Sequence, residues 1–169
     1  RALRVRAALS RGASAFEAGR AIEGARAFDE ALVAAGSDPR SLLRVALRFS
    51  ERPGLESRGV ELAGQAVERA PREREGREAL GWCLLRAGDP RGAKGCFEAS
   101  LALPDPSGLG DAPARFGLAA SLVALGEEEE GAALLGRALE SSPELRAEAE
   151  HSPFFERLRA SGRFPRPGR

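Results

Sequence analysis

Few side chains in this sequence are of the types that perform catalysis or bind metal ions. The one histidine, His151, stands beside Ser152, but no aspartate lies near it in the sequence, so nothing indicates a catalytic triad. The two cysteines, Cys83 and Cys96, lie 13 residues apart, and with one histidine they match no zinc-binding pattern. We therefore predict that the protein is not an enzyme and holds no metal or cofactor. Both cysteines are expected to be small apolar core residues rather than a redox pair.

Two further motifs are weak as ligand sites. Gly108-x-Gly110 lacks the rest of a phosphate-binding loop, and no strand is predicted before it. The acidic run from Glu127 to Glu130 stands at the start of a predicted helix, where negative charge stabilises the helix dipole. Both motifs are therefore expected to be structural, and His151 is expected to be exposed or next to a helix end.

Arginine and tryptophan are the residue types in this chain that are best suited to recognition. Arg44, Arg48 and Arg52 recur every four residues, so on a helix they form one ridge. Guanidinium groups can bind carboxylates through two parallel hydrogen bonds. The only tryptophan, Trp82, has Arg86 one helical turn further on, and Trp and Arg most often anchor protein interfaces. These residues favour recognition of an acidic protein segment.

The composition argues against two other classes of partner. The formal net charge is +1, and acids are interspersed with the arginines, as in Arg72-Glu73-Arg74-Glu75, which indicates an ion-paired, solvated surface. Aromatic side chains that could stack on bases are not interleaved with the basic ones. No apolar run approaches the roughly 18 residues of a membrane span. We therefore predict neither nucleic-acid binding nor membrane insertion.

Composition also predicts an all-α protein. Ala, Gly, Leu, Arg and Glu dominate the 169 residues, and four of these five types are good helix formers. β-branched residues are scarce, which argues against sheet. The absence of Met, Tyr, Asn and Thr is typical of a GC-rich genome and favours a bacterial source. Because the sequence begins at Arg1 without an initiator Met, we expect a processed product or a piece of a longer chain. We expect a cytoplasmic protein, or a periplasmic one if a signal sequence was removed.

A pattern of small and apolar residues occurs four times along the chain. A small residue marks the same point of each copy, with steps of 35, 34 and 38 residues: Ala31, Ala66, Ser100 and Ala138. A glycine suited to ending a helix precedes each of them: Gly19, Gly54, Gly88 and Gly126. The steps are near the period of about 34 residues of a helix-turn-helix solenoid unit.

This periodicity predicts where the helices lie. The expected ranges are 2–17, 20–35, 40–50, 55–70, 73–86, 90–102, 112–125 and 128–141. Three dipeptides place a capping side chain before a proline and so predict helix starts: Asp38-Pro39, Asp89-Pro90 and Ser142-Pro143.

The repeats resemble the tetratricopeptide repeat (TPR) family. The third copy carries the family pattern as Leu80-Gly81-x-x-Leu84, Ala93-x-x-x-Phe97 and Pro104, and the fourth as Leu118-Ala119-x-x-Leu122, Gly131-x-x-x-Leu135 and Pro143. The first and second copies are weaker, with Arg11-Gly12-x-x-Ala15 in the first and Ala63 in place of the aromatic residue in the second. The resemblance covers about residues 5–143. It implies a right-handed superhelical solenoid of about four TPR repeats, followed by C-terminal capping helices.

The predicted domain organisation follows this resemblance. The TPR array is expected at 1–143, with repeats at about 5–39, 40–72, 74–107 and 112–143, and with Pro104–Gly110 as a surface loop. Residues 144–164 are expected to hold two short capping helices, near 143–151 and 153–160. Their apolar residues would cover the exposed face of the last repeat: Phe154, Phe155, Leu158 and Phe164. A disordered tail is expected at 165–169.

The resemblance also implies that the first helix of each repeat lines a concave groove. Transferred to this sequence, the groove positions of the family include nine residues that we predict to bind a partner: Arg6, Phe16, Arg44, Arg48, Arg52, Glu78, Trp82, Arg86 and Phe116. The expected partner is an acidic segment, extended or helical. Arg44, Arg48 and Arg86 would hold its carboxylates, and Trp82 and Phe116 its apolar side chains. The alternative is that Trp82 serves packing and the arginines are only solvated.

The predicted function is a non-catalytic protein–protein interaction module, a scaffold or adaptor that binds a peptide or another protein in its groove. One alternative is a regulatory or sensory arm of a larger bacterial enzyme or transcription factor. A second alternative is a self-assembling structural protein, a homo-oligomer that uses its weakly capped front end against a neighbour.

Overall fold

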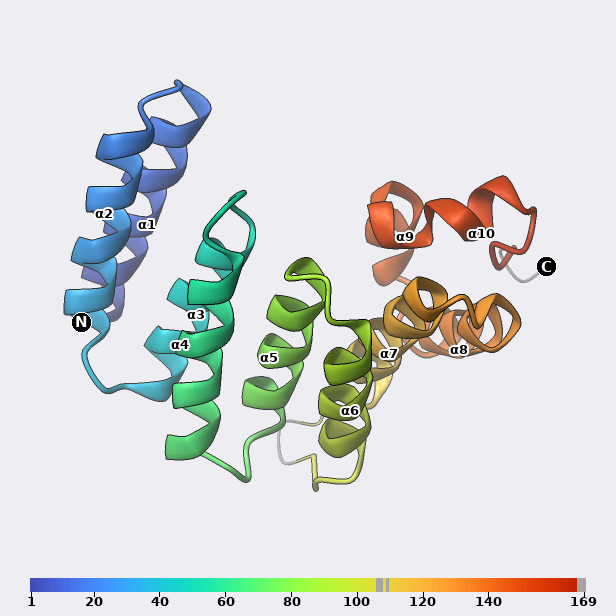
Figure 1. Ribbon diagram of the computed structural model, residues 1–169. Coiled ribbons are helices and arrows are strands. Elements are labelled where there is room, and N and C mark those ends of the chain that lie inside the picture. The colour runs from blue at the N-terminus through green and yellow to red at the C-terminus, as the bar shows by residue number, and fades with distance from the viewer. Residues whose placement is uncertain (106–107, 109, 167–169) are drawn as a thin grey trace.

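All regular structure in the described part of the chain is helical (Figure 1), and the computed structural model describes residues 1–105, 108 and 110–166. The first eight helices are α1 (Ala2–Glu17), α2 (Ala21–Ala35), α3 (Pro39–Ser50), α4 (Glu56–Arg69), α5 (Arg74–Arg86), α6 (Pro90–Leu101), α7 (Ala112–Leu125) and α8 (Glu128–Ser141). Then follow α9 (Leu145–His151), the 3-10 turn η1 (Pro153–Phe155) and α10 (Glu156–Ala160). The prediction of an all-α protein is confirmed, and the predicted bounds of the first eight helices agree within one residue.

The eight helices pair into four hairpins that stack side by side along the molecule (Figure 1). Within the hairpins α1 packs on α2, α3 on α4, α5 on α6 and α7 on α8. Each later hairpin places its first helix against the hairpin before it, as α5 does against α4 and α7 against α6. Among the described residues, none of the helices is long and apolar enough to cross a bilayer.

Two of the three dipeptides predicted to start a helix, Asp38-Pro39 and Asp89-Pro90, do so in the structure. The carboxylates of Asp38 and Asp89 accept hydrogen bonds from the backbone N–H groups of Ser41 and Gly92, both at 2.9 Å, and so cap α3 and α6. The hydrogen bonds from Ser41 also lower the pKa of Asp38. At the other ends, Gly88 and Gly126 adopt φ values of 83° and 89°, which only glycine takes without strain, and they turn the chain into the next helix.

The third dipeptide, Ser142-Pro143, does not start a helix directly, and this prediction was wrong. The N–H groups of Leu145 and Arg146 donate to the carbonyls of Ser142 and Pro143, at 3.1 Å each. These bonds span three residues rather than four, so a tight turn forms first and α9 begins only at Leu145.

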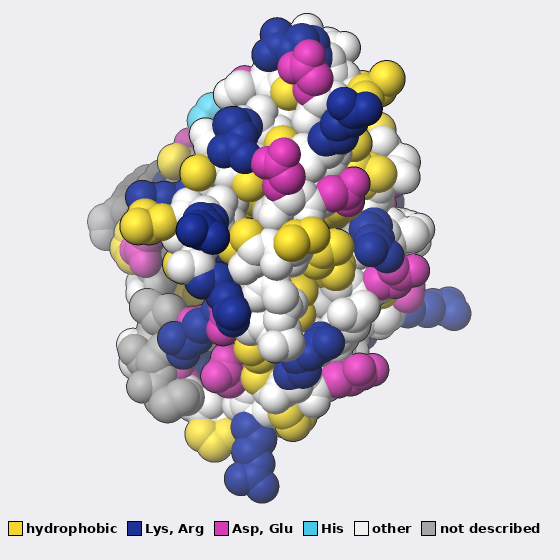
Figure 2. Space-filling view, turned by 90° about the vertical axis from the view of Figure 1, so that its left-hand side faces the viewer, with side chains coloured by type: hydrophobic (Ala, Val, Ile, Leu, Met, Phe, Trp, Pro, Cys, Tyr) yellow, Lys and Arg dark blue, Asp and Glu magenta, His cyan; other side chains and the backbone are white. Residues whose placement is uncertain are grey.

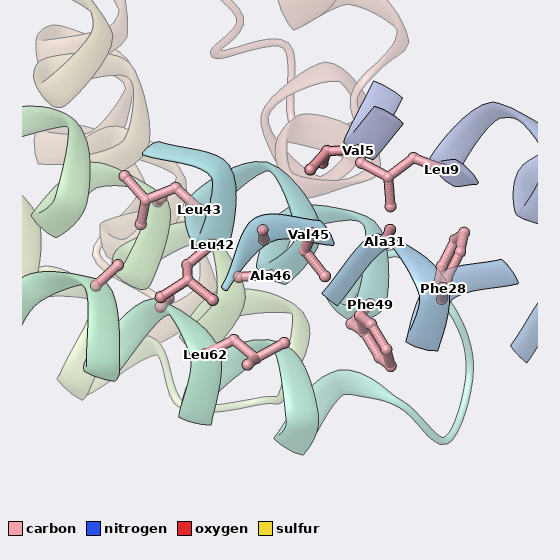
Figure 3. Close-up of a cluster of buried hydrophobic side chains, with 14 of the residues drawn as sticks. Val5, Leu9, Phe28, Ala31, Leu42, Leu43, Val45, Ala46, Phe49 and Leu62 are labelled. Atoms are coloured by element: carbon pink, nitrogen blue, oxygen red, sulfur yellow. The ribbon is translucent and has the colours of Figure 1, made fainter. Parts of the chain in front are cut away.

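The hydrophobic core runs through the stacked hairpins as two clusters. The first cluster joins the first two hairpins to α5 (Figure 3), and its labelled members are Val5, Leu9, Phe28, Ala31, Leu42, Leu43, Val45, Ala46, Phe49 and Leu62. The second cluster joins α5–α8 to the closing segment, the name we give to residues 145–164. The apolar positions predicted from the repeat pattern, such as Phe28, Phe97 and Leu135, are fully buried.

A charged clamp fixes the connection between the third and fourth hairpins. Arg74, whose side chain is only 11% exposed, donates from Nε to the carbonyl of Leu103 at 2.9 Å and forms a salt bridge with Asp111 at 3.0 Å. The same guanidinium also reaches the carbonyl of Leu101. These contacts secure both ends of the predicted loop at Pro104–Gly110, of which residues 106, 107 and 109 lie outside the described residues.

The closing segment folds back over α7 and α8. Phe155 and Leu158 are fully buried, and Glu128 at the start of α8 forms ion pairs with Arg157 at 2.9 Å and Arg163 at 3.4 Å. The prediction of one helix over 153–160 was wrong in detail, because the N–H of Phe155 donates to the carbonyl of Ser152 and makes a 3-10 turn before α10. In the predicted tail at 165–169, residues 167–169 lie outside the described residues.

The outer face of the first hairpin is mixed in character. Figure 2 looks onto this end of the molecule and shows arginine and acidic side chains interspersed with apolar ones. The large apolar side chains that are exposed in the described structure all belong to this hairpin: Leu3, Ile22 and Val33.

Candidate peptide-binding groove

A groove of about 680 Å³ lies between α1 and α3, the first helices of two neighbouring hairpins. We call it the basic groove, because four arginines and two glutamates are among its lining residues: Arg6, Leu9, Ser10, Ala13, Glu17, Arg44, Leu47, Arg48, Glu51 and Arg52. The structure therefore brings together four of the nine residues predicted to bind a partner. They converge because α1 and α3 follow each other in the stack, so side chains at equivalent helical positions face the same space.

The arginines of the basic groove differ in how far they are already engaged. Arg48 forms an ion pair with Glu51 at 2.8 Å on the exposed surface. For Arg6 and Arg44, both exposed, no carboxylate in the described part of the chain lies within salt-bridge distance. These two guanidinium groups keep their hydrogen-bond donors available to a ligand.

Arg52 lies at the floor of the basic groove and is held by an aromatic ring. Its guanidinium carbon lies 5.1 Å from the centre of the Phe16 ring, a cation–π contact. Its Nε is buried without a hydrogen-bond partner among the described residues. Phe16, another predicted partner-binding residue, is half-buried and packs edge-on against Phe28 at 5.3 Å. Phe16 therefore does not line the basic groove itself but packs against Arg52, which does.

A second pocket, of about 620 Å³, lies next to the basic groove on its C-terminal side. We call it the junction pocket, because the array and the closing segment meet there. Its lining residues are Ser50, Glu51, Trp82, Leu85, Arg86, Glu148, His151, Ser152, Pro153 and Phe154. Glu51 lines both surfaces, so the two lie next to each other. Trp82 and Arg86, which the sequence predicts for partner binding, thus lie in the pocket next to the basic groove.

The aromatic residues around Trp82 form one contiguous cluster. The Trp82 ring lies 5.5 Å from Phe97, 5.9 Å from Phe116 and 5.8 Å from Phe154, measured between ring centres. Phe116 is only 3% exposed and packs edge-on against Phe155 at 5.1 Å. Trp82 is therefore half-buried with part of its surface in the junction pocket, while Phe116 lies beneath the closing segment and is not at the surface.

The carboxylate of Glu78 is directed into its own hairpin. It accepts a hydrogen bond from the hydroxyl of Ser100 on α6 at 2.8 Å, and it lines neither the basic groove nor the junction pocket. Burial raises the pKa of Glu78, although the hydrogen bond from Ser100 acts in the opposite direction. In this structure Glu78 thus connects α5 to α6.

Replacing Glu78 with glutamine is expected to raise the free energy of unfolding at pH 7. The variant keeps an acceptor for Ser100 and removes a charge that burial disfavours. A carboxyl group whose pKa rises on folding stabilises the protein at low pH, and this contribution is lost as the pH rises through the folded-state pKa. The gain should therefore vanish below about pH 4, where the carboxyl is protonated in both states. Chemical denaturation across pH measures it, with exposed Glu98→Gln as the control; an equal response in both variants would contradict the prediction.

The residues with catalytic or metal-binding potential are not brought together. Cys83 is buried and Cys96 half-buried, and burial raises the pKa of both thiols. His151 is exposed, and its Nδ1 lies 2.7 Å from the carbonyl of Ala147, to which it donates. Within the described residues, no cluster of three His, Cys, Asp or Glu side chains could hold a metal ion. At the start of α8, Glu127 pairs with Lys94 at 3.4 Å.

The sequence interpretation missed the part that the closing segment plays in the pocket. Glu148, His151 and Phe154 line the junction pocket, although these residues were expected only to cap the array. One signal could have indicated this: Phe154 and Phe155 are adjacent, so their side chains point in different directions and are not expected to be buried equally. The structure buries Phe155 fully and leaves Phe154 half-exposed.

Comparisons with known proteins bear on the fold. No protein-family model matches the sequence, and no curated protein matches it significantly. Among solved structures, the crystal structure of MamA protein is similar over 98% of each chain, with 17% sequence identity and a TM-score of 0.53. MamA is a TPR-containing protein. This chain therefore has a TPR-type helical repeat fold, the fold class predicted from its sequence.

Proposed function

We propose that this protein is a non-catalytic interaction scaffold that binds an acidic segment of another protein along its concave groove. The observation that carries the proposal is the basic groove, where four arginines face two glutamates and, within the described residues, only Arg48 among these arginines has a carboxylate within salt-bridge distance. Helical repeat proteins commonly use such extended concave surfaces for binding. A segment with several carboxylates complements this surface in charge.

The arginines of the basic groove can bind carboxylates without breaking strong existing ion pairs. Arg6 and Arg44 have no carboxylate of the described residues within salt-bridge distance. The fork of a guanidinium matches the two oxygens of a carboxylate. The ion pair between Arg48 and Glu51 is exposed, and such pairs contribute about 0–1 kcal/mol, so Arg48 can exchange Glu51 for an acidic residue of the partner. Phe116 and Glu78 are left out of the proposed contact surface, because one is buried and the other bonds Ser100.

Charge reversal in the basic groove is expected to weaken binding of an acidic peptide. The probe is a fluorescein-labelled octapeptide in which Asp and Glu alternate with Gly and Ser, and fluorescence anisotropy measures its affinity. Arg44→Glu and Arg48→Glu should each weaken binding about tenfold or more, since hydrogen bonds to charged groups contribute about 1.5–3 kcal/mol. The affinity of the unmodified protein should also fall as salt is raised.

Arg58→Glu is the matched control for these variants. Arg58 pairs with Glu61 three residues on at 2.9 Å, as Arg48 does with Glu51, and its side chain has a similar exposure, 50% against 53%. However, Arg58 lies on α4 and not in the basic groove. The control should change affinity less than about twofold at moderate salt. Equal losses in all three variants, or no loss in the groove variants, would contradict the proposal.

The two other roles predicted from the sequence stay predictions. A regulatory arm predicts a catalytic or DNA-binding region elsewhere in the open reading frame. Self-assembly predicts that the apparent molar mass measured by light scattering rises with protein concentration. The exposed Leu3, Ile22 and Val33 on the first hairpin are the natural residues to substitute in the second test.

A further inference from the structure

The closing segment forms one wall of the junction pocket, which lies next to the basic groove. Three separate parts of the chain line the junction pocket: the end of α3, the second half of α5, and the stretch from α9 to η1. The closing segment is held in place independently of any ligand, because Phe155 and Leu158 are fully buried and Arg159 donates to the carbonyls of Ala149 and Ser152 at 2.9 Å. The pocket therefore exists before a partner arrives.

The lining of the junction pocket is apolar where the array meets the closing segment. The rings of Trp82 and Phe154 are tilted by 45° to each other with centres 5.8 Å apart, and Leu85 lies beside them in the lining. Trp82 is fixed from behind by Phe97 and Phe116, so it does not move aside. Because both Trp82 and Phe154 are only half-buried, an apolar side chain entering the pocket would remove further ring surface from water.

A cation without an acidic partner stands next to this apolar surface. The guanidinium of Arg86 lies over the Trp82 ring at 5.8 Å, and it makes one long hydrogen bond, 3.4 Å, to the hydroxyl of Ser50. No carboxylate among the described residues lies within salt-bridge distance of Arg86. The glutamate that the pocket shares with the basic groove, Glu51, is paired with Arg48. Arg86 is therefore placed to bind a carboxylate from a ligand.

We propose that the junction pocket takes one apolar side chain of the bound segment, with a neighbouring carboxylate of the same segment on Arg86. The inference rests on the proposed function, because one segment is taken to occupy both the basic groove and the adjacent junction pocket, which share Glu51 in their linings. The partner is then a protein segment with several acids and one apolar anchor such as Phe or Leu. The acids supply most of the encounter rate, and the anchor fixes the position of the segment along the groove.

The only tryptophan of the chain makes this occupancy directly measurable. Trp82 lines the pocket and is the only tryptophan, so a change in its intrinsic fluorescence on peptide binding reports a change in its surroundings there. Two labelled acidic peptides serve as probes, identical except for one Phe, replaced by Ala in the second peptide. The Phe peptide should bind about tenfold more tightly, as expected for partial burial of an aromatic side chain, and it alone should shift the Trp82 emission.

Two variants on the closing segment separate pocket binding from stability. Phe154 and Leu145 are both partly buried and pack on the same core cluster, but only Phe154 lines the pocket. Phe154→Ala should reduce the preference for the Phe peptide to within twofold, while Leu145→Ala should retain it. Both peptides carry an acidic residue next to the Phe or Ala position. Arg86→Gln leaves the apolar pocket in place and should weaken the binding of both peptides. Thermal unfolding followed by circular dichroism shows whether each variant is folded.

The outcomes distinguish this inference from the function on which it rests. The proposal for the junction pocket is overturned if the unmodified protein binds both peptides equally, or if Phe154→Ala keeps the preference for the Phe peptide. Either result is still compatible with a scaffold that binds acidic segments. Failure of both peptides to bind overturns both. A Phe preference lost in Phe154→Ala and kept in Leu145→Ala supports the pocket.

Discussion

Replacing Phe97 with alanine is expected to lower the free energy of unfolding by about 3–5 kcal/mol, as measured by chemical denaturation. Phe97 is fully buried on α6, and its ring lies where α5, α6 and α7 come together. Two glycines create the space for it, because a Cβ added at Gly81 or at Gly117 would collide with the Phe97 ring. A single aromatic ring thus fills the gap left by two helices that carry no side chain there.

The cost is high because nothing nearby can fill the cavity. The helices beside the ring are already in contact through glycine, and collapse would require moving whole hairpins. Since small domains are stable by only about 5–15 kcal/mol, this loss is a large fraction of the total stability. Near-ultraviolet circular dichroism should also weaken, because Phe97 supports the indole of Trp82 at 5.5 Å.

Glu98→Ala is the control for this prediction. Glu98 is the next residue on α6 and is exposed, so its substitution should stay within about 0.5 kcal/mol of the unmodified protein. A loss below about 1 kcal/mol in Phe97→Ala would mean that the third and fourth hairpins do not meet through this ring.

The contact between Gly81 and Phe97 also shows what the sequence could predict. Small residues at fixed repeat positions indicate where helices touch, and large apolar ones indicate what is buried between them. Helix contact points and buried apolar positions both depend on neighbours within one hairpin or the next. The repeat pattern of the sequence therefore predicts both. The fold and the helix bounds could therefore be read from the sequence almost completely.

The site was less predictable, because it depends on a segment outside the repeat pattern. Arg44, Arg48 and Trp82 reach the concave side, as their repeat positions imply. However, periodicity contains no information on where α9 and η1 return, and they cover Phe116 and add Phe154 to the pocket. Glu78 differs for another reason: Ser100 offers its carboxylate a hydrogen bond inside the hairpin, and this contact depends on side-chain chemistry rather than helix position.

Two glycines on α4 are expected to respond to alanine with opposite signs. Gly64→Ala should raise the free energy of unfolding by about 0.5–1 kcal/mol, because alanine favours the helix over glycine and nothing lies within 4 Å of the added Cβ. Gly59→Ala should lower it by about 1–2 kcal/mol. The same gain in helix propensity applies there, but overpacking costs about 1–3 kcal/mol and exceeds it when neighbours cannot move.

The neighbours of Gly59 cannot move aside because two of the nearest atoms belong to the backbone of α3. A Cβ at this position would lie 2.8 Å from the carbonyl oxygen of Ala46 and 2.9 Å from the backbone nitrogen of Ser50, both on α3. Backbone atoms within a helix shift only with the helix itself, whereas a clash with the far end of a side chain is relieved by a rotamer change. In the third hairpin the equivalent residue is Ala93, fully buried, so the repeat position as such accepts alanine.

The Gly59 and Gly64 pair therefore tests how close α3 and α4 lie, independently of helix propensity. The two substitutions are the same, stand on the same helix five residues apart, and differ only in what the new methyl group meets. Stabilisation of similar size in both would mean that α3 and α4 are further apart than the structure places them. In that case the wall of the basic groove that α3 provides would also lie elsewhere, since Arg44 and Arg48 stand on the same helix as Ala46 and Ser50.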